Sequence, residues 1–251
     1  EPDGTPGGGP QKVGVAVADL MTGMYAVAGI LAALRHAEAS GEGQHIDLAL
    51  LDTQVGWLAN QAMNYLVGGN VPQRQGTAHP NIVPYQVMPS ADGHFMLAVG
   101  NDAQFRRLCT VLGRSELGVD PRFASNAARV AQRATLIPLV ADELRKQPSA
   151  YWLAALSHAT VPCSPVNDLA QVFDDPQVLA RGMRLDLPHA LGGSEPLVAS
   201  PLRLSATPVE YQRAPPLLGA DTRSVLQQRL GLDAARIEAL AQAGIIGLPP
   251  A

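Results

Sequence analysis

The sequence lacks the short motifs that would assign a metal or redox chemistry directly. Its histidines form no HExxH or other paired metal spacing; they lie at positions 36, 45, 79, 94, 158 and 189. No GxSxG nucleophile elbow is present, and no GxGxxG follows a predicted strand. We therefore expect neither a bound metal nor a tightly bound cofactor.

Charged residues and cysteines are also scarce. Charged residues make up 16% of the 251 residues, and the net charge of −4 disfavours nucleic acid or an anionic membrane as a partner. The longest uncharged apolar run has about eleven residues, short of the ~20 that span a bilayer. No basic segment precedes an apolar core at the N-terminus, so we expect no secretory signal. Cys109 and Cys163 are isolated, which indicates free thiols in a reducing, cytoplasmic compartment.

The sequence does contain a long segment of small and apolar residues that begins near Asp19. Residues 25–34 carry no charge, so they predict a helix that is apolar on every side and tightly buried. Asp19 lies where this helix should begin. Its carboxylate is either an N-cap that accepts hydrogen bonds from the first turn, or a nucleophile. With a reference pKa near ~3.9, an aspartate is ionised at neutral pH and needs no base to activate it. The pattern alone does not choose between these two roles.

Several motifs in order along the chain resemble one enzyme family. Residues 14–52 are similar to the segment that carries the catalytic aspartate in family III CoA-transferases (CaiB/BaiF), which include formyl-CoA transferase and succinyl-CoA:glutarate CoA-transferase. In this comparison Asp19 matches the nucleophile, and Gly23 follows it as expected. Further matches lie at residues 76–86, 92–93, 100–105, 120–129, 161–167, 175–178 and 217–222. Their order across most of the chain makes the resemblance specific.

The resemblance implies transfer of coenzyme A from an acyl-CoA donor to a small carboxylic acid. Asp19 would form an aspartyl anhydride and then an aspartyl-CoA thioester, with coenzyme A as a substrate rather than a cofactor. Family members form interlocked homodimers, so we expect the same here. Two alternatives remain open. One is an α-methylacyl-CoA racemase-type isomerase, and the other is a non-catalytic fragment or subunit.

Residues 71–84 form a loop that is long for a plain connection and rich in glycine and proline. It is either a domain linker or, by the resemblance, an active-site loop that covers the catalytic aspartate. The loop residues that carry the resemblance are Gly76, Thr77, Ala78, His79 and Pro80. Formyl-CoA transferase has a run of glycines here, so formate is a poorly supported acyl group. The His79 ring either donates a hydrogen bond to a carboxylate substrate or is simply solvated.

The fold class that the resemblance implies is α/β, as the C-terminal part of such an enzyme. Residues 1–70 would complete a doubly wound large domain that includes Asp19, with residues 1–10 as a surface loop. Residues 85–184 would form a smaller α+β domain, and residues 185–251 would return to the large domain. The N-terminal portion of the family is missing from this sequence, and a separate N-terminal fragment is one partner that would supply it.

The expected elements follow from periodicity and turn signals. Strands or extended segments are predicted at residues 45–51, 84–88, 94–99, 161–166, 185–187 and 201–204. Helices are predicted at residues 52–67, from 102 to about 112, and at 126–146, 149–157, 169–173, 176–181, 221–230 and 233–243. We expect Asp102 to cap its helix and Pro138 to bend the helix that contains it. Arg122, Arg129 and Arg133 either form an anion site or are the solvated or salt-bridged side of helices, and we favour the second interpretation.

Overall fold

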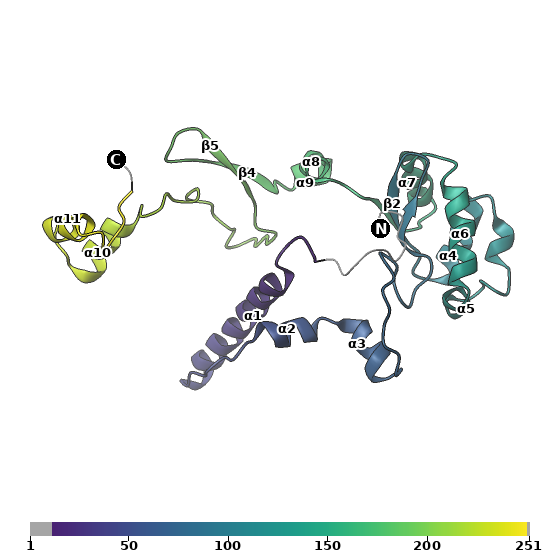
Figure 1. Ribbon diagram of the computed structural model, residues 1–251, viewed down its shortest axis with the longest axis horizontal. Helices are drawn as coiled ribbons and strands as arrows, with labels where there is room; N and C mark the ends of the chain where they lie inside the picture. Colours follow the sequence, from purple (N-terminus) through teal and green to yellow (C-terminus); the bar gives the residue numbers. More distant parts are fainter. Residues whose placement is uncertain (1–11, 250–251) are drawn as a thin grey trace. The chain divides into compact units, whose positions relative to one another are not determined.

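The computed structural model describes residues 12–249 (Figure 1). The contacts between residues divide the chain after Val166 into two units, Glu1–Val166 and Asn167–Ala251. The surface loop expected at residues 1–10 lies outside the described residues. Helices and antiparallel strands are mixed within the chain, which agrees with the predicted α/β class. The domain boundaries at residues 70, 84 and 184, and the interlocked dimer, stay predictions.

Helix α1, Val17–Ser40, is the apolar helix that the sequence predicts, and Gly41 ends it with a φ of 78°. Its expected burial is wrong within this chain, because the helix has no buried residue. Leu20, Met24 and Leu31 are each 62% exposed. Exposed apolar surface of this extent often marks an interaction site, and within the described residues the contacts of α1 with α2 leave it uncovered.

By length and composition alone, α1 is able to cross a membrane. It has 24 residues, and its most apolar 18-residue window has a mean hydropathy of 1.7. The uncharged eleven-residue run therefore underestimates the apolar length of this helix, because its mean hydropathy stays high even when Asp19 and Thr22 are included. A core helix of a soluble protein or a signal sequence passes the same test. The length of the apolar run therefore no longer supports the expectation that the protein binds no membrane.

The strand predicted at residues 45–51 is wrong. Residues 42–49 have no regular structure, and helix α2, Leu50–Gly56, begins inside the predicted strand. A buried parallel strand needs neighbouring strands to hydrogen-bond with, and the described residues supply none there. The helix predicted at 52–67 is split into α2 and α3, Ala59–Leu66, and Ala59 has a φ of 49° at the break.

The predicted hairpin is confirmed as strands β1, Tyr85–Pro89, and β2, His94–Ala98. Strand β3, Cys163–Pro165, lies within the extended segment predicted at 161–166 and pairs antiparallel with β2. The order is β1-β2-β3, which leaves β1 as an edge strand. Every second residue of the hairpin is buried, as a half-covered sheet requires.

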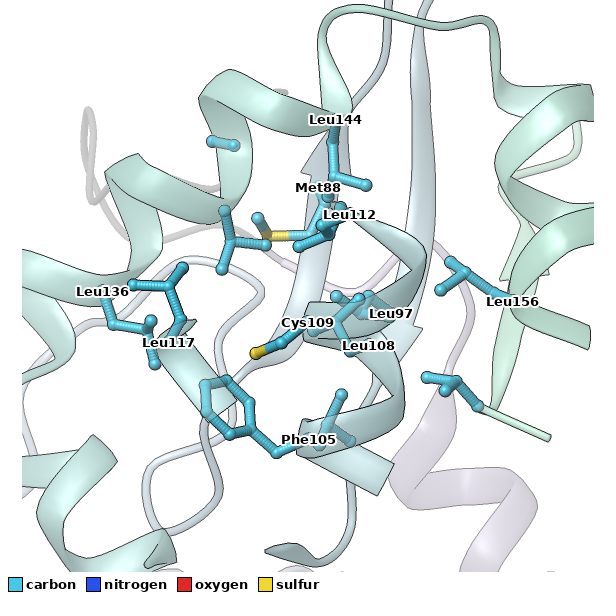
Figure 2. Packing of buried hydrophobic residues seen from close by; sticks show 14 of the residues in the cluster. Met88, Leu97, Phe105, Leu108, Cys109, Leu112, Leu117, Leu136, Leu144 and Leu156 are labelled. Atoms are coloured by element: carbon cyan, nitrogen blue, oxygen red, sulfur yellow. The ribbon is translucent and has the colours of Figure 1, made fainter. Parts of the chain in front are cut away.

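Helices cover this sheet and form the core with it (Figure 2). They are α4, Asp102–Val111; α5, Asn126–Ala131; α6, Arg133–Leu144; and α7, Ser149–His158, together with the short helix η1, Ser115–Gly118. Phe105, Leu108 and Cys109 of α4 point into the core, as their spacing predicts. The cap of α4 is Asn101 rather than Asp102, since its side chain accepts the N–H of Gln104. The helix predicted at 126–146 breaks at Gln132, and Pro138 lies inside α6.

The second unit, Asn167–Ala251, has little core of its own. It contains helices α8, Leu169–Asp174, and α9, Pro176–Ala180, then strands β4, Arg184–Pro188, and β5, Ser194–Val198, and finally helices α10, Thr222–Leu230, and α11, Ala234–Gln242.

Strand β4 confirms the prediction at 185–187. The strand predicted at 201–204 is wrong, because the antiparallel partner of β4 is β5. Residues 194–198 were missed because Glu195 and Pro196 interrupt the apolar pattern.

Arg129 lies in the middle of the first unit's core with no exposed surface. Its Nε donates to the Val83 carbonyl at 2.7 Å and its Nη1 to the Phe123 carbonyl at 2.9 Å. Its Nη2 pairs with the Asp102 carboxylate at 2.8 Å, and the guanidinium lies 4.5 Å from the centre of the Phe105 ring. Of the two predicted environments, solvated or salt-bridged, the structure therefore gives Arg129 the salt bridge, at a fully buried position.

Replacing Arg129 by methionine should lower the free energy of unfolding by about 2–4 kcal/mol, because two buried carbonyls lose their donors and Asp102 loses its partner. Urea titration of the purified protein measures this change. Arg145→Met is the matched control, because the Arg145 side chain is 53% exposed and contacts only the exposed Asp142. Its effect should stay within about 0.5 kcal/mol. Equal losses in the two variants would contradict the structural role assigned to Arg129.

Burial raises the pKa of the Cys109 thiol to about 11, although the nearby Arg129 charge partly opposes this shift. The unfolded chain then loses its thiol proton at lower pH than the folded chain does. The contribution of the Cys109 thiol to the free energy of unfolding is fully present below about pH 8.5, and it declines as the pH rises towards the folded-state pKa. Unfolding free energies measured between about pH 7 and about pH 10 should fall less steeply for Cys109→Ala than for the unmodified protein. The same pH dependence of the unfolding free energy in both proteins would contradict a raised pKa of the Cys109 thiol.

Candidate functional site

Asp19 lies in the first turn of α1, but it does not cap the helix. The N-cap is Ala16, and no side chain accepts a hydrogen bond at this end. The cap interpretation of Asp19 is therefore wrong. The Asp19 side chain is exposed, and its carboxylate has no hydrogen-bond or ion-pair partner among residues 12–249. Its lone pairs are free for a reacting group.

Backbone donors lie beside this carboxylate because the helix begins without a cap. The first helical hydrogen bond runs from the Leu20 N–H to the Ala16 carbonyl at 3.0 Å. Within the described part of the chain, the N–H groups of Ala18 and Asp19 have no backbone acceptor. Free N–H groups and the positive end of a helix dipole attract negative charge. This end of α1 therefore combines a free carboxylate with groups that stabilise an oxyanion.

The loop at residues 71–84 follows α3 and runs beside the edge strand β1. Gly76 has a φ of 58° inside a turn that the Ala78 N–H closes onto the Gln75 carbonyl at 3.0 Å, a conformation that favours glycine. The Val87 N–H then donates to Thr77 Oγ1 at 3.1 Å, and the His79 N–H donates to the Tyr85 carbonyl at 2.8 Å. These bonds attach the C-terminal half of the turn, at Thr77 and His79, to β1.

The His79 ring has a defined orientation and tautomer. It stacks on Tyr85, with 5.3 Å between ring centres and 20° between ring planes. The Asn81 N–H donates to His79 Nδ1 at 3.1 Å. Because Nδ1 is an acceptor, the proton of the neutral ring is on Nε2. Nε2 has no partner in the part of the chain that the structure describes, so it is available as a donor.

Asn81 connects this ring to helices on two sides. Its Oδ1 accepts from the Nδ2 groups of Asn60 at 3.0 Å and Asn64 at 3.2 Å, both on α3. Its Nδ2 donates back to Asn64 Oδ1 at 3.0 Å. Its carbonyl accepts from Asn126 Nδ2 of α5 at 2.8 Å. The N–H, carbonyl and side-chain amide of Asn81 are thus all used, which fixes the peptide that contacts His79.

A cavity of about 600 Å³ lies between α3 and the loop. Amide side chains dominate its polar lining, and no charged side chain of the described residues lines it; the amides are those of Gln61, Asn64, Asn70, Gln73, Gln75 and Asn81. A cavity of about 570 Å³ in the other unit lies between α8 and the β4–β5 hairpin, and its described lining contains no predicted site residue. Of the predicted loop residues, Pro80 lines the loop cavity and His79 does not, so the polar groups offered there are neutral amide donors and acceptors.

Residues 2–222 match the sequence pattern of the family described as CoA-transferase family III. The chain belongs to this family. Succinate–glutarate CoA-transferase of Agrobacterium fabrum is 50% identical over 225 residues, which cover 90% of this chain and 56% of that protein. Human succinyl-CoA:glutarate CoA-transferase is 35% identical over 243 residues, which cover 97% of this chain and 56% of the human protein.

Solved structures of family members and relatives have the same fold. A CaiB/BaiF family protein from Brucella suis is 44% identical and superposes with a TM-score of 0.71, covering 92% of this chain and 60% of that one. A hypothetical protein from Mycobacterium tuberculosis is 24% identical with a TM-score of 0.74, covering 88% and 57%, and supports the fold alone. The chain spans a little over half the length of the relatives that it matches.

Both predicted parts of the family III site, Asp19 and the loop at 76–80, belong to the first compact unit. No hydrogen bond or ion pair joins them among the described residues. Sequence reasoning missed Asn81, Asn126 and Arg133 as residues that hold the loop. The i, i+3 spacing of Asn126 and Arg129 was a usable signal, because such positions share one face of α5; Arg133 begins the next helix, α6, so spacing gave no signal for it.

Proposed function

We propose that this chain is part of an enzyme that transfers coenzyme A from an acyl-CoA donor to a carboxylic acid. The proposal rests on one observation. The Asp19 carboxylate has no partner among the described residues and lies in the first turn of α1, whose N-terminus has no side-chain cap, in a chain that belongs to CoA-transferase family III. Its relatives act on dicarboxylates according to their names, and the most identical of those described is a succinate–glutarate enzyme. Succinyl-CoA as donor and glutarate as acceptor are therefore the pair to test first.

The proposed reaction proceeds in four displacements. The Asp19 carboxylate attacks the thioester carbonyl of the donor, and the C–S bond breaks to give a mixed anhydride and CoA thiolate. The thiolate attacks the aspartyl carbonyl of the anhydride, which releases the donor acid and leaves an aspartyl-CoA thioester. The acceptor carboxylate attacks this carbonyl and displaces the thiolate, forming a second anhydride. The thiolate finally attacks the acceptor acyl carbon, which restores Asp19 and releases the new thioester.

The surroundings of Asp19 suit these steps. Each attack places negative charge on a carbonyl oxygen, and the free N–H groups of Ala18 and Asp19 are donors of the kind that stabilise such a charge. The anhydride and thioester intermediates hydrolyse in water, so the site must be covered during turnover. In this proposal the residues 76–80 supply part of that cover, and His79 Nε2 donates to the acceptor carboxylate.

Asp19→Ala in the complete protein should abolish transfer from succinyl-CoA to glutarate, with a loss of at least about a thousandfold, because no other carboxylate takes over as nucleophile. Initial rates measure this loss. Intact mass after incubation with succinyl-CoA should show a CoA adduct on the peptide that contains Asp19, and the variant should show none. Asp142→Ala is the control, since the Asp142 side chain is 71% exposed and should leave the rate unchanged.

A folded Asp19→Ala protein that still transfers coenzyme A would overturn the proposed nucleophile. Exchange of the α-proton of an acyl-CoA in the absence of any acceptor acid would instead support the racemase-type alternative. Absence of an adduct and of transfer in the complete, folded protein would support the non-catalytic alternative.

His79→Phe should keep the ring that stacks on Tyr85 but remove the Nε2 donor. A hydrogen bond to a charged group is worth about 1.5–3 kcal/mol, so the KM for glutarate should rise by about 10- to 100-fold. His79→Gln carries an N–H at a similar reach and should recover part of the loss. Steady-state kinetics with glutarate as the varied substrate measure both effects. Equal KM values in His79→Phe and the unmodified protein would exclude this contact.

A further inference from the structure

Arg133 directs its guanidinium at the loop rather than at a carboxylate. Its Nη2 donates to the His79 carbonyl at 2.6 Å and to the Pro80 carbonyl at 3.0 Å. The side chain is partly buried, and no acidic group pairs with it among residues 12–249. Several exposed arginines of the described residues pair with a nearby carboxylate instead, as Arg122 does with Asp120 at 2.7 Å and Arg145 with Asp142 at 3.1 Å. Arg133 is therefore used in a different way, as a cation bound to two consecutive carbonyls.

These two hydrogen bonds set the orientation of the peptides that follow His79 and Pro80. The next N–H, that of Asn81, then points at His79 Nδ1. The Asn81 side chain is fixed from the other side by Asn60 and Asn64 of α3. The contacts of Arg133 and Asn81 thus determine which ring nitrogen carries the proton and which way the ring faces.

A purely structural role is the alternative explanation for Arg133. A loop needs some attachment to its domain, and Asn126 and Arg129 already provide it through the Asn81 carbonyl and through both backbone polar groups of Val83. Arg133 adds the only bonds in the described structure that reach the carbonyls of His79 and Pro80. If Arg133 only attached the loop to its domain, it would repeat what Asn126 and Arg129 already do, and its loss would not affect the His79 ring.

We propose that Arg133 is a positioning residue, which holds the loop so that the Asn81 N–H keeps the His79 ring in its Nε2–H form, facing the acceptor acid. This inference rests on the proposed function, in which His79 Nε2 donates to that acid. An arginine suits the task because its rigid, planar guanidinium stays charged and donates to two acceptors at once.

Arg133→Met in the complete protein removes both hydrogen bonds and keeps the aliphatic part of the side chain. Arg145→Met is the matched control, an identical substitution at the exposed residue that follows α6. The first measurement is the long-range ¹H–¹⁵N spectrum of histidine-labelled protein, with His79 assigned by comparison with His79→Gln. The unmodified protein and the control should show the Nε2–H tautomer of the neutral His79 ring as the tautomer present. Arg133→Met should show both tautomers.

The second measurement is steady-state kinetics. Arg133→Met should raise the KM for glutarate about tenfold or more, since the donor that binds the acid loses its orientation, and should change kcat at saturating glutarate by less than about threefold. Arg133→Lys keeps the charge and one donor and should recover part of the loss. This variant also serves as the test protein if Arg133→Met does not fold, with the same two measurements.

The results separate the positioning role from the proposed function. An unchanged tautomer together with an unchanged KM in a folded Arg133 variant overturns the positioning role. An equal change in Arg145→Met also overturns it, because the effect would then be nonspecific. If the unmodified protein transfers no coenzyme A, the proposed function fails, while the spectrum still decides whether Arg133 controls the His79 ring.

Discussion

The first unit depends on one buried charge. Arg129 lies at the centre of the sheet–helix core, and its guanidinium joins the end of the loop, through Val83, to the segment before α5, through Phe123, and to α4, through Asp102. Removing a guanidinium from water costs several kcal/mol unless every donor finds a partner, and here the partners are mostly backbone carbonyls. The end of the loop that carries His79 is thereby fixed to the core of this unit, and the chemistry of the loop depends on that packing.

Helix α1 presents the opposite situation. It carries the proposed nucleophile, yet none of its residues is buried by this chain. An apolar helix in water gains little from its own hydrogen bonds, and most helix stability comes from packing. The chain spans a little over half the length of the relatives that it matches. In the proposed enzyme, residues beyond those described here would cover α1. In the proposed enzyme, ordering of the nucleophile and completion of the substrate site would then be a single event.

The sequence predicts the elements whose partners lie nearby. The hairpin at 85–98 and helix α4 were recognisable because a turn signal and a local apolar face determine each of them. Residues 45–51 show the limit, since their apolar pattern suits a strand only when neighbouring strands exist. The nucleophile role of Asp19 rests on family resemblance and stays a proposal, whereas the cap interpretation failed because Ala16 is the N-cap of α1. Asn81 and Arg133 were missed because their roles depend on contacts between residues 17 to 54 positions apart in sequence.

The bonds between the loop and β1 have a consequence for solubility. β1 is an edge strand, and an edge strand with free N–H and carbonyl groups is a template for pairing with another chain. Thr77 Oγ1 and the His79 N–H occupy two of these groups, on Val87 and Tyr85. A loop that lifted away to admit a substrate would expose that edge. The hydrogen bonds that attach the loop to β1 therefore also protect this edge of the sheet against strand addition and aggregation.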